Sequence, residues 1–168
     1  MILISHHGID TLTNTRAAHA GPAGEPLLGA AELLALLHRF PNVVLWLNGH
    51  THTNAVRPRR DPADPARGFW EVTTCAVIDW PCQTRVVELL DHGEYLSIVT
   101  TMVDHDAPVG PASLGPASLE SADDLAALHR ELAANVPWNV AAMAGAPADR
   151  NLELRVVPPF PLSRLPGA

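Results

Sequence analysis

Two groups of histidines follow apolar runs in this 168-residue sequence. His6 comes directly after residues 1–5, and His50 and His52 come after residues 43–47 and a glycine that permits a sharp turn. In extended backbone, side chains at i and i+2 point to the same side, so His50 and His52 can bind one metal ion, or one each of two ions. Two ions about 3.5–4 Å apart hold the attacking and leaving oxygens in phosphoryl transfer. The pattern therefore indicates a metal centre.

The apolar runs at 1–5 and 43–47 read as buried strands, because runs of this kind are typical of sheets covered on both faces. An amphipathic helix is predicted between them and should end before Pro41. Its apolar positions are Ala30, Leu33, Leu34 and Leu37. A strand, a helix and a second strand form a crossover unit with parallel strands. Both histidine groups then lie at the carboxyl ends of neighbouring strands, where α/β proteins gather ligands.

The second half of the chain reads as mostly antiparallel, which makes the fold class α/β with a mixed sheet. Residues 57–67 are predicted to form a charged loop, since Pro58, Pro62 and Pro65 interrupt them. Strands are predicted at 69–74, 84–90, 95–103 and 152–157, with a turn at 91–94. Ser121 and Asp124 resemble a capping box that begins a helix ending near Asn135.

Residues 1–168 are expected to form a single domain or part of one. Residues 107–120 contain Gly-Pro-Ala-Ser-Leu twice in tandem and read as a low-complexity linker, and the Pro-rich tail at 158–168 should fray. Cys75 and Cys82 match no common zinc or redox spacing. Two semi-buried thiols are the favoured interpretation, with a disulfide as the alternative in an exported protein.

Composition narrows the classes of partner. A net charge of −7 and the absence of lysine argue against a nucleic-acid or anionic-membrane surface. No apolar run approaches the roughly 20 residues that a transmembrane helix needs, and residues 1–5 are too short for a secretory signal. The expected partner is a small molecule or a metal, and the default location of a chain without a signal is the cytoplasm.

At these motifs the chain resembles the calcineurin-like metallophosphoesterases. Gly49-His50-Thr51-His52 matches the last ligand motif of that family, Gly-His-Xaa-His, and His6 matches an earlier histidine at the end of another strand. The family usually has proline where Gly8 stands. His7 is the other candidate for this ligand, although a packing or supporting role is favoured for it. The resemblance covers roughly the first hundred residues and is closest to a subgroup with long inserts, whose members are often exported.

The resemblance implies a four-layer α/β/β/α sandwich and a phosphate-ester substrate. It also implies two divalent ions (Mn, Fe or Zn), the first bound by His52 and the second by His50 and His6. Arg57 and Arg59 are candidates for bidentate contact with a substrate phosphate, with a solvated loop as the favoured alternative.

The family's carboxylate-bearing motifs, Asp-Xaa-His, Gly-Asp-Xaa-Xaa-Asp and Gly-Asn-His, do not occur in the sequence. Asp10, Asp79 and Asp106 are present, but none stands in a matching context. A dinuclear site needs carboxylate oxygen, so we expect a C-terminal part of a phosphoesterase, inactive as an isolated chain, with Met1 internal to a longer protein. We also expect the first strand to expose an unpaired edge and to favour self-association.

Two other functions fit the same residues. The first is a mononuclear zinc hydrolase in which His6, His50 and His52 bind one ion and leave a position open for water. The second is a non-catalytic module whose exposed strand edge pairs with another protein.

Overall fold

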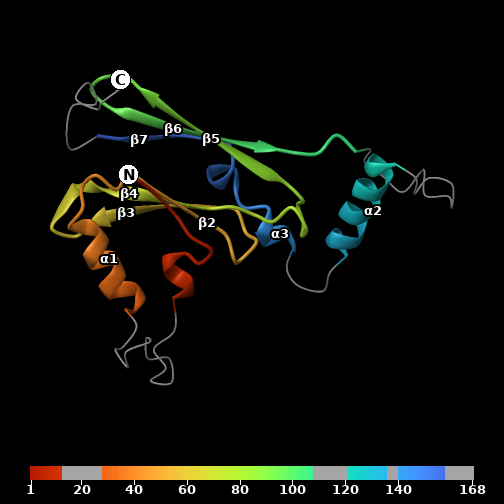
Figure 1. Cartoon of the computed structure of the whole chain (residues 1–168), viewed down its shortest axis with the longest axis horizontal. Helices are drawn as coiled ribbons and strands as arrows, with labels where there is room; N and C mark the ends of the chain where they lie inside the picture. The colour runs from red at the N-terminus through yellow and green to blue at the C-terminus, as the bar shows by residue number, and fades with distance from the viewer. Residues whose placement is uncertain (13–27, 108–120, 136–139, 158–168) are drawn as a thin grey trace.

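The computed structural model describes residues 1–12, 28–107, 121–135 and 140–157. They form a mixed α/β structure with two sheets (Figure 1). None of the helices in these ranges combines the length and apolar character that a membrane span requires. Of the predicted linker at 107–120, only Ala107 is described, and it is buried. The tail at 158–168 lies outside the described residues.

The first sheet contains the predicted crossover unit. Strand β1 (Ile2–Ile4) pairs in parallel with β2 (Leu45–Asn48), and helix α1 (Ala30–His38) connects them in sequence. Strand β4 (Asp64–Thr73) adds in parallel on the other side of β2, and β3 (Ala55–Asp61) pairs antiparallel with β4. The order is β1-β2-β4-β3. The carboxyl ends of three parallel strands therefore lie at the same edge of this sheet.

The prediction of a charged loop at residues 57–67 is wrong. These residues form the hairpin of β3 and β4, in which Pro58 stands opposite Trp70. Proline is tolerated because β3 is an edge strand and needs no amide donor on its outer side. Gly68, with a φ of 138°, allows the close pairing, since a Cβ there would lie 2.3 Å from the carbonyl oxygen of Arg59.

The second sheet is antiparallel, as predicted for this half of the chain. Its order is β5-β6-β7, with bounds Thr84–Asp91, Leu96–Val103 and Leu152–Val156. Gly93, with a φ of 82°, lies in the predicted turn between β5 and β6. Helix α2 (Ala122–Ala134) begins as predicted, because the Asp124 amide donates to Ser121 Oγ at 3.1 Å. The short helices are η1 (Ile9–Thr11), α3 (Val140–Met143) and η3 (Pro147–Asp149).

Helix α1 and the two sheets form three layers (Figure 1). Trp46 and Phe69 pack on one face of the first sheet against the apolar side of α1. Leu45 and Val72 pack on the opposite face against Ile98 of the second sheet. Strand β2 is thus covered on both faces, which explains why its sequence is continuously apolar.

Strand β1 lies at an edge of the first sheet and pairs only with β2 among the described strands. Its outward side chain Ile4 is 79% exposed, and Ile2 is also exposed. The predicted unpaired edge is found, but the prediction of a buried strand at residues 1–5 is wrong, because a strand at the edge of the sheet is covered only in part.

Candidate metal centre

The ends of β1 and β2 bring His6 and His50 together. Backbone pairing continues beyond the strands, with the Ser5 amide donating to the Leu47 carbonyl and the Gly49 amide donating to the His6 carbonyl, each at 3.1 Å. His6 Nε2 and His50 Nδ1 are 3.1 Å apart. The predicted meeting of these two imidazoles at one edge of the sheet is therefore found in the structure.

His7 belongs to the same cluster. One ring nitrogen from each of His6, His7 and His50 lies within 4.8 Å of the other two, and all three side chains are exposed. The rings of His7 and His50 are 3.9 Å apart between centroids, and His7 Nδ1 is 3.2 Å from Thr11 Oγ1. A supporting role was the favoured interpretation of His7, but its ring is as well placed as that of His6 to bind an ion.

His52 occupies a different position from the other histidines. Its Nδ1 is hydrogen-bonded to Asp79 Oδ2, and both side chains are partly buried. His52 is not a member of the three-histidine cluster of the described residues. Side chains at i and i+2 share a side only in extended backbone, but His50 has a φ of 65° and His52 a φ of 53°. The chain turns at both residues, so the two rings do not project side by side.

Left-handed backbone at a residue with a Cβ costs about 1–3 kcal/mol and concentrates at binding and catalytic sites. Here it occurs twice within Gly49-His50-Thr51-His52, and the turn is closed by the Thr51 amide donating to the Gly49 carbonyl at 2.8 Å. The surrounding structure therefore stabilises a conformation that these histidines would not adopt by preference. This local conformation points to a site.

The pKa of His50 is lowered. The neighbouring rings displace water from the imidazole, and the charges that His7, His6 and His52 carry when protonated add repulsion. A neutral imidazole offers a lone pair to a metal ion, whereas a protonated one does not. The clustering of histidines thus favours the neutral form of His50, which is the form that binds metal.

A buried carboxylate on β4 holds the segment that follows His6 and His7 in place. Glu71 on β4 is 1% exposed, and its Oε1 accepts hydrogen bonds from the Ile9 amide and from Asn48 Nδ2, each at 2.9 Å. Gly8 packs against this pair, since a Cβ there would lie 2.6 Å from Glu71 Oε1. The family's usual proline has no room at this position. Glu71 therefore connects the segment that follows His6 and His7 to the centre of the sheet.

The two candidate arginines have different surroundings. Arg59 is 16% exposed, and its Nη2 lies 2.5 Å from Glu71 Oε2 and 2.9 Å from Asp10 Oδ2. Burial opposes its charge, but the hydrogen bonds with Glu71 and Asp10 outweigh burial and raise the pKa of Arg59. Arg57 is 48% exposed and lies 3.5 Å from Asp10. Arg59 is thus a structural cation, whereas Arg57 is the one of the two that an external anion can reach.

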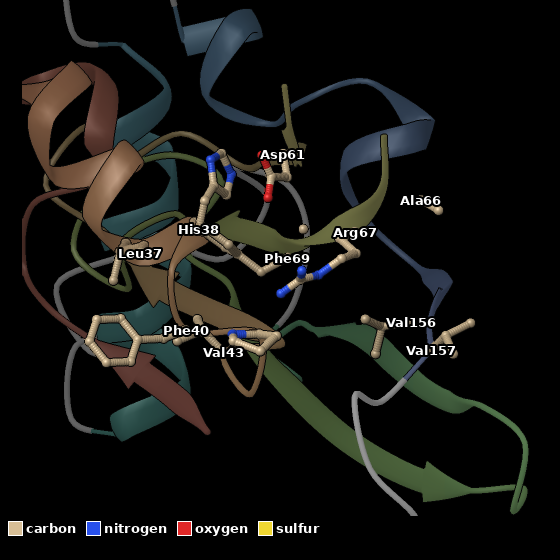
Figure 2. Close-up of a pocket in the computed structure, with 12 residues that line it drawn as sticks. Leu37, His38, Phe40, Val43, Asp61, Ala66, Arg67, Phe69, Val156 and Val157 are labelled. Carbon is tan, nitrogen blue, oxygen red and sulfur yellow. The ribbon is translucent and has the colours of Figure 1, made fainter. Parts of the chain in front are cut away.

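Two hollows lie at opposite ends of the first sheet. One of about 210 Å³ adjoins the histidine motif and is lined by Gly8, Asp10, Thr51, Thr53 and Arg57, among others. The other, of about 290 Å³, lies between the end of α1 and the tip of the β3–β4 hairpin (Figure 2). It is largely apolar and sits at the amino ends of the parallel strands, away from the cluster of His6, His7 and His50. The smaller hollow is the one placed to hold a ligand beside the cluster.

Asp79 matches no motif of the metallophosphoesterases, so the resemblance to that family does not identify it as a site residue. A physical signal was available, however. Asp79 lies in the segment that leaves the carboxyl end of β4, and β4 is parallel to β2. Ligands gather at the carboxyl ends of parallel strands, and this holds for the residues after residue 73 as well as for those after residue 47.

No family model matches the chain, and no curated protein shows significant similarity to it. The function is therefore inferred from the residues and their geometry.

Proposed function

We propose that this chain binds a divalent metal ion through His6 and His50 and belongs to a hydrolase of phosphate esters. The observation that carries the proposal is the 3.1 Å separation of His6 Nε2 and His50 Nδ1 at adjacent strand ends. Two imidazole nitrogens on one tetrahedral zinc ion, each about 2.0–2.1 Å from the metal, are about 3.3 Å apart. The side chains thus stand near the separation of ligands to one ion.

The match of Gly49-His50-Thr51-His52 to the last ligand motif of metallophosphoesterases supports phosphate-ester chemistry in particular. In such an enzyme two ions (Mn, Fe or Zn) activate a water for in-line attack on phosphorus. His52 is then the ligand of the first ion, and His50 and His6 are ligands of the second. The four-layer sandwich of that family is part of this proposal.

The substrate side of the proposal rests on Arg57. It lines the 210 Å³ hollow next to the histidine motif, and its partner Asp10 is itself half exposed. A phosphate group in the hollow can replace that weak surface ion pair with a bidentate contact through two of its oxygens. Arg59 has no such freedom because Glu71 holds it, so we assign substrate contact to Arg57 alone.

The ligand atoms in the cluster limit the hydrolytic activity that we expect of this chain. The cluster found among the described residues contains imidazoles and no carboxylate, whereas a dinuclear site requires a bridging carboxylate. We therefore expect this chain to bind metal with little or no hydrolysis by itself. Hydrolysis would depend on carboxylate ligands supplied from outside the chain.

The experiment is a calorimetric titration of the chain with Zn²⁺ and Mn²⁺, repeated for His6→Ala and His50→Ala. Losing a partner of a ligand costs about 10- to 100-fold in affinity, and losing a ligand should cost more. His92→Ala is the matched control, because His92 stacks on Tyr95 at the turn between β5 and β6. Unchanged affinity in both cluster variants would refute the proposal.

A mononuclear zinc site is a second candidate, favoured by one observation. His6, His7 and His50 already bring three nitrogens within 4.8 Å, which is the donor set of a three-histidine zinc site with an open position for water. His7→Ala separates the two candidates. It should abolish binding to a three-histidine site, but it should change binding by His6 and His50 only slightly. One tightly bound ion per chain, with slow hydrolysis of bis(p-nitrophenyl) phosphate, would favour the mononuclear site.

A further inference from the structure

The segment at 74–83 connects the two sheets and carries a carboxylate to the histidine motif. It leaves the carboxyl end of β4 and enters β5, so it passes the edge of the first sheet where the histidines lie. Asp79 lies within it, and its Oδ2 is hydrogen-bonded to His52 Nδ1. This is a contact between residues 27 positions apart, made across the edge of the sheet.

The segment is held in place on several sides. The Cys75 amide donates to the buried Asn54 Oδ1 at 3.1 Å, and the Cys82 amide donates to the Asp79 carbonyl at 2.6 Å. Helix α2 also contributes, since His129 Nε2 lies 2.9 Å from the Ile78 carbonyl oxygen. The backbone of the segment that carries Asp79 is therefore held by Asn54, which precedes β3, and by α2, so the position of Asp79 does not depend on His52 alone.

The chemistry of the contact fixes the proton on the ring. A carboxylate only accepts hydrogen bonds, so His52 Nδ1 must carry a hydrogen. In the neutral ring the lone pair is then on Nε2, the nitrogen that points away from Asp79. Histidine ligands of metals commonly have this arrangement, with the second ring nitrogen donating to a carboxylate, which fixes ring orientation and makes the ligand more basic.

We propose that Asp79 is a positioning residue that holds His52 in the Nδ1–H form and presents Nε2 as its metal-binding atom. The role toward a metal rests on the proposed function, whereas the tautomer is a property of the metal-free chain. The left-handed backbone at His52 is consistent with this role, because the ring contacts Asp79 through Nδ1 and is not part of the cluster of His6, His7 and His50.

The test is two-bond ¹H–¹⁵N correlation spectroscopy of the chain labelled with ¹⁵N-histidine, without metal and at a pH where the imidazoles are neutral. His52, assigned by the signal lost in His52→Gln, should show the Nδ1–H pattern. His129 and His38 are internal references for the other tautomer, because their Nε2 atoms face the carbonyl oxygens of Ile78 and Arg59. Both should show the Nε2–H pattern in the same spectrum.

Asp79→Ala should convert His52 to the Nε2–H form or to exchange between the two forms. Asp10→Asn is the control. It removes one carboxylate charge from the hollow beside the histidine motif and should leave the tautomer of His52 unchanged. In the titrations, Asp79→Ala should weaken binding of the ion that His52 holds by about 10- to 100-fold. Asp79→Glu should restore part of that loss, since it supplies a carboxylate again.

Wild-type His52 in the Nε2–H form, or a His52 pattern that does not respond to Asp79→Ala, would overturn this inference even if the chain binds metal. The converse result separates the two proposals. An Nδ1–H pattern that depends on Asp79, in a chain with no affinity for Zn²⁺ or Mn²⁺, would support the positioning of His52 and reject the metal-dependent function.

Discussion

Replacing Glu71 with glutamine should destabilise the fold and loosen the histidine loops together. The carboxylate is buried, accepts from the Ile9 amide and Asn48, and pairs with Arg59. Glutamine keeps the volume and one acceptor oxygen, but it turns an amide NH₂ group toward the guanidinium. Breaking a buried ion pair by removing one partner costs about 3–5 kcal/mol. Arg59 keeps Asp10 as a second partner, so we expect the lower end, about 3 kcal/mol.

The measurement is urea unfolding followed by tryptophan fluorescence, with thermal unfolding as a second readout. A loss of about 3 kcal/mol corresponds to a fall in Tm of about 6–12 °C for a chain of this size. Glu88→Gln is the matched control. Glu88 is exposed on β5, so its replacement should change the free energy of unfolding by less than about 0.5 kcal/mol.

A double-mutant cycle with Arg59→Met tests the reason as well as the magnitude. Removing both charges leaves neither buried without a partner, so the double variant should lose less than the sum of the single losses, with a coupling of about 1 kcal/mol or more. A single-variant loss below about 1 kcal/mol, or additive losses in the cycle, would show that Glu71 does not stabilise the sheet in the way described.

Three further results are expected. Gly8→Ala should cost about 1–3 kcal/mol in urea unfolding, because the added Cβ lies 2.6 Å from Glu71 Oε1 and the sheet must shift; full stability would place the loop elsewhere. The pKa of His50 is lowered in the folded chain, so as pH falls the unfolded chain takes up a proton first, near the ordinary value of 6.5. The contribution of His50 to the free energy of unfolding is therefore present above that pH and is lost as pH falls. His50→Gln should lack this part of the acid sensitivity when unfolding free energies are compared across that range. Ile4→Lys should reduce self-association in sedimentation velocity, because it places a charge on the exposed edge strand β1, and an unchanged monomer fraction would exclude that edge.

The sequence was sufficient to predict the crossover unit and the antiparallel second half. The apolar spacing of α1 and the continuous apolar run of β2 report burial directly, because one helix face and both strand faces are covered. The hairpin at 57–67 was not predictable from its prolines. An edge strand accommodates proline, and whether a strand lies at an edge depends on the order of strands in the sheet, which the local sequence does not encode.

For the candidate site, the sequence predicts where the histidines lie better than it predicts how their rings are oriented. Strand ends located His6 and His50 correctly, since parallel pairing carries register from one strand to the next. The orientation of His52 depends on left-handed backbone, which is uncommon for a residue with a Cβ, so a rule derived from extended chains does not describe it. The segment that carries Asp79 also follows a strand end, but which of its residues contacts His52 is fixed only when the two sheets pack.

The positions of His52 and Asp79 together show how the site is built. The first half of the chain provides the imidazoles on a crossover unit of parallel strands, and the segment between the two sheets provides the carboxylate that orients one of them. Arg85 on β5 connects the same regions, donating to Asn54 Oδ1 at 3.0 Å and to Thr100 at 3.1 Å. Asn54 in turn accepts from the Cys75 amide at the start of the segment that carries Asp79. Packing of the second sheet therefore sets the position of Asp79, and a substitution at Arg85, outside the site, should disturb His52 before it disturbs His6 or His50.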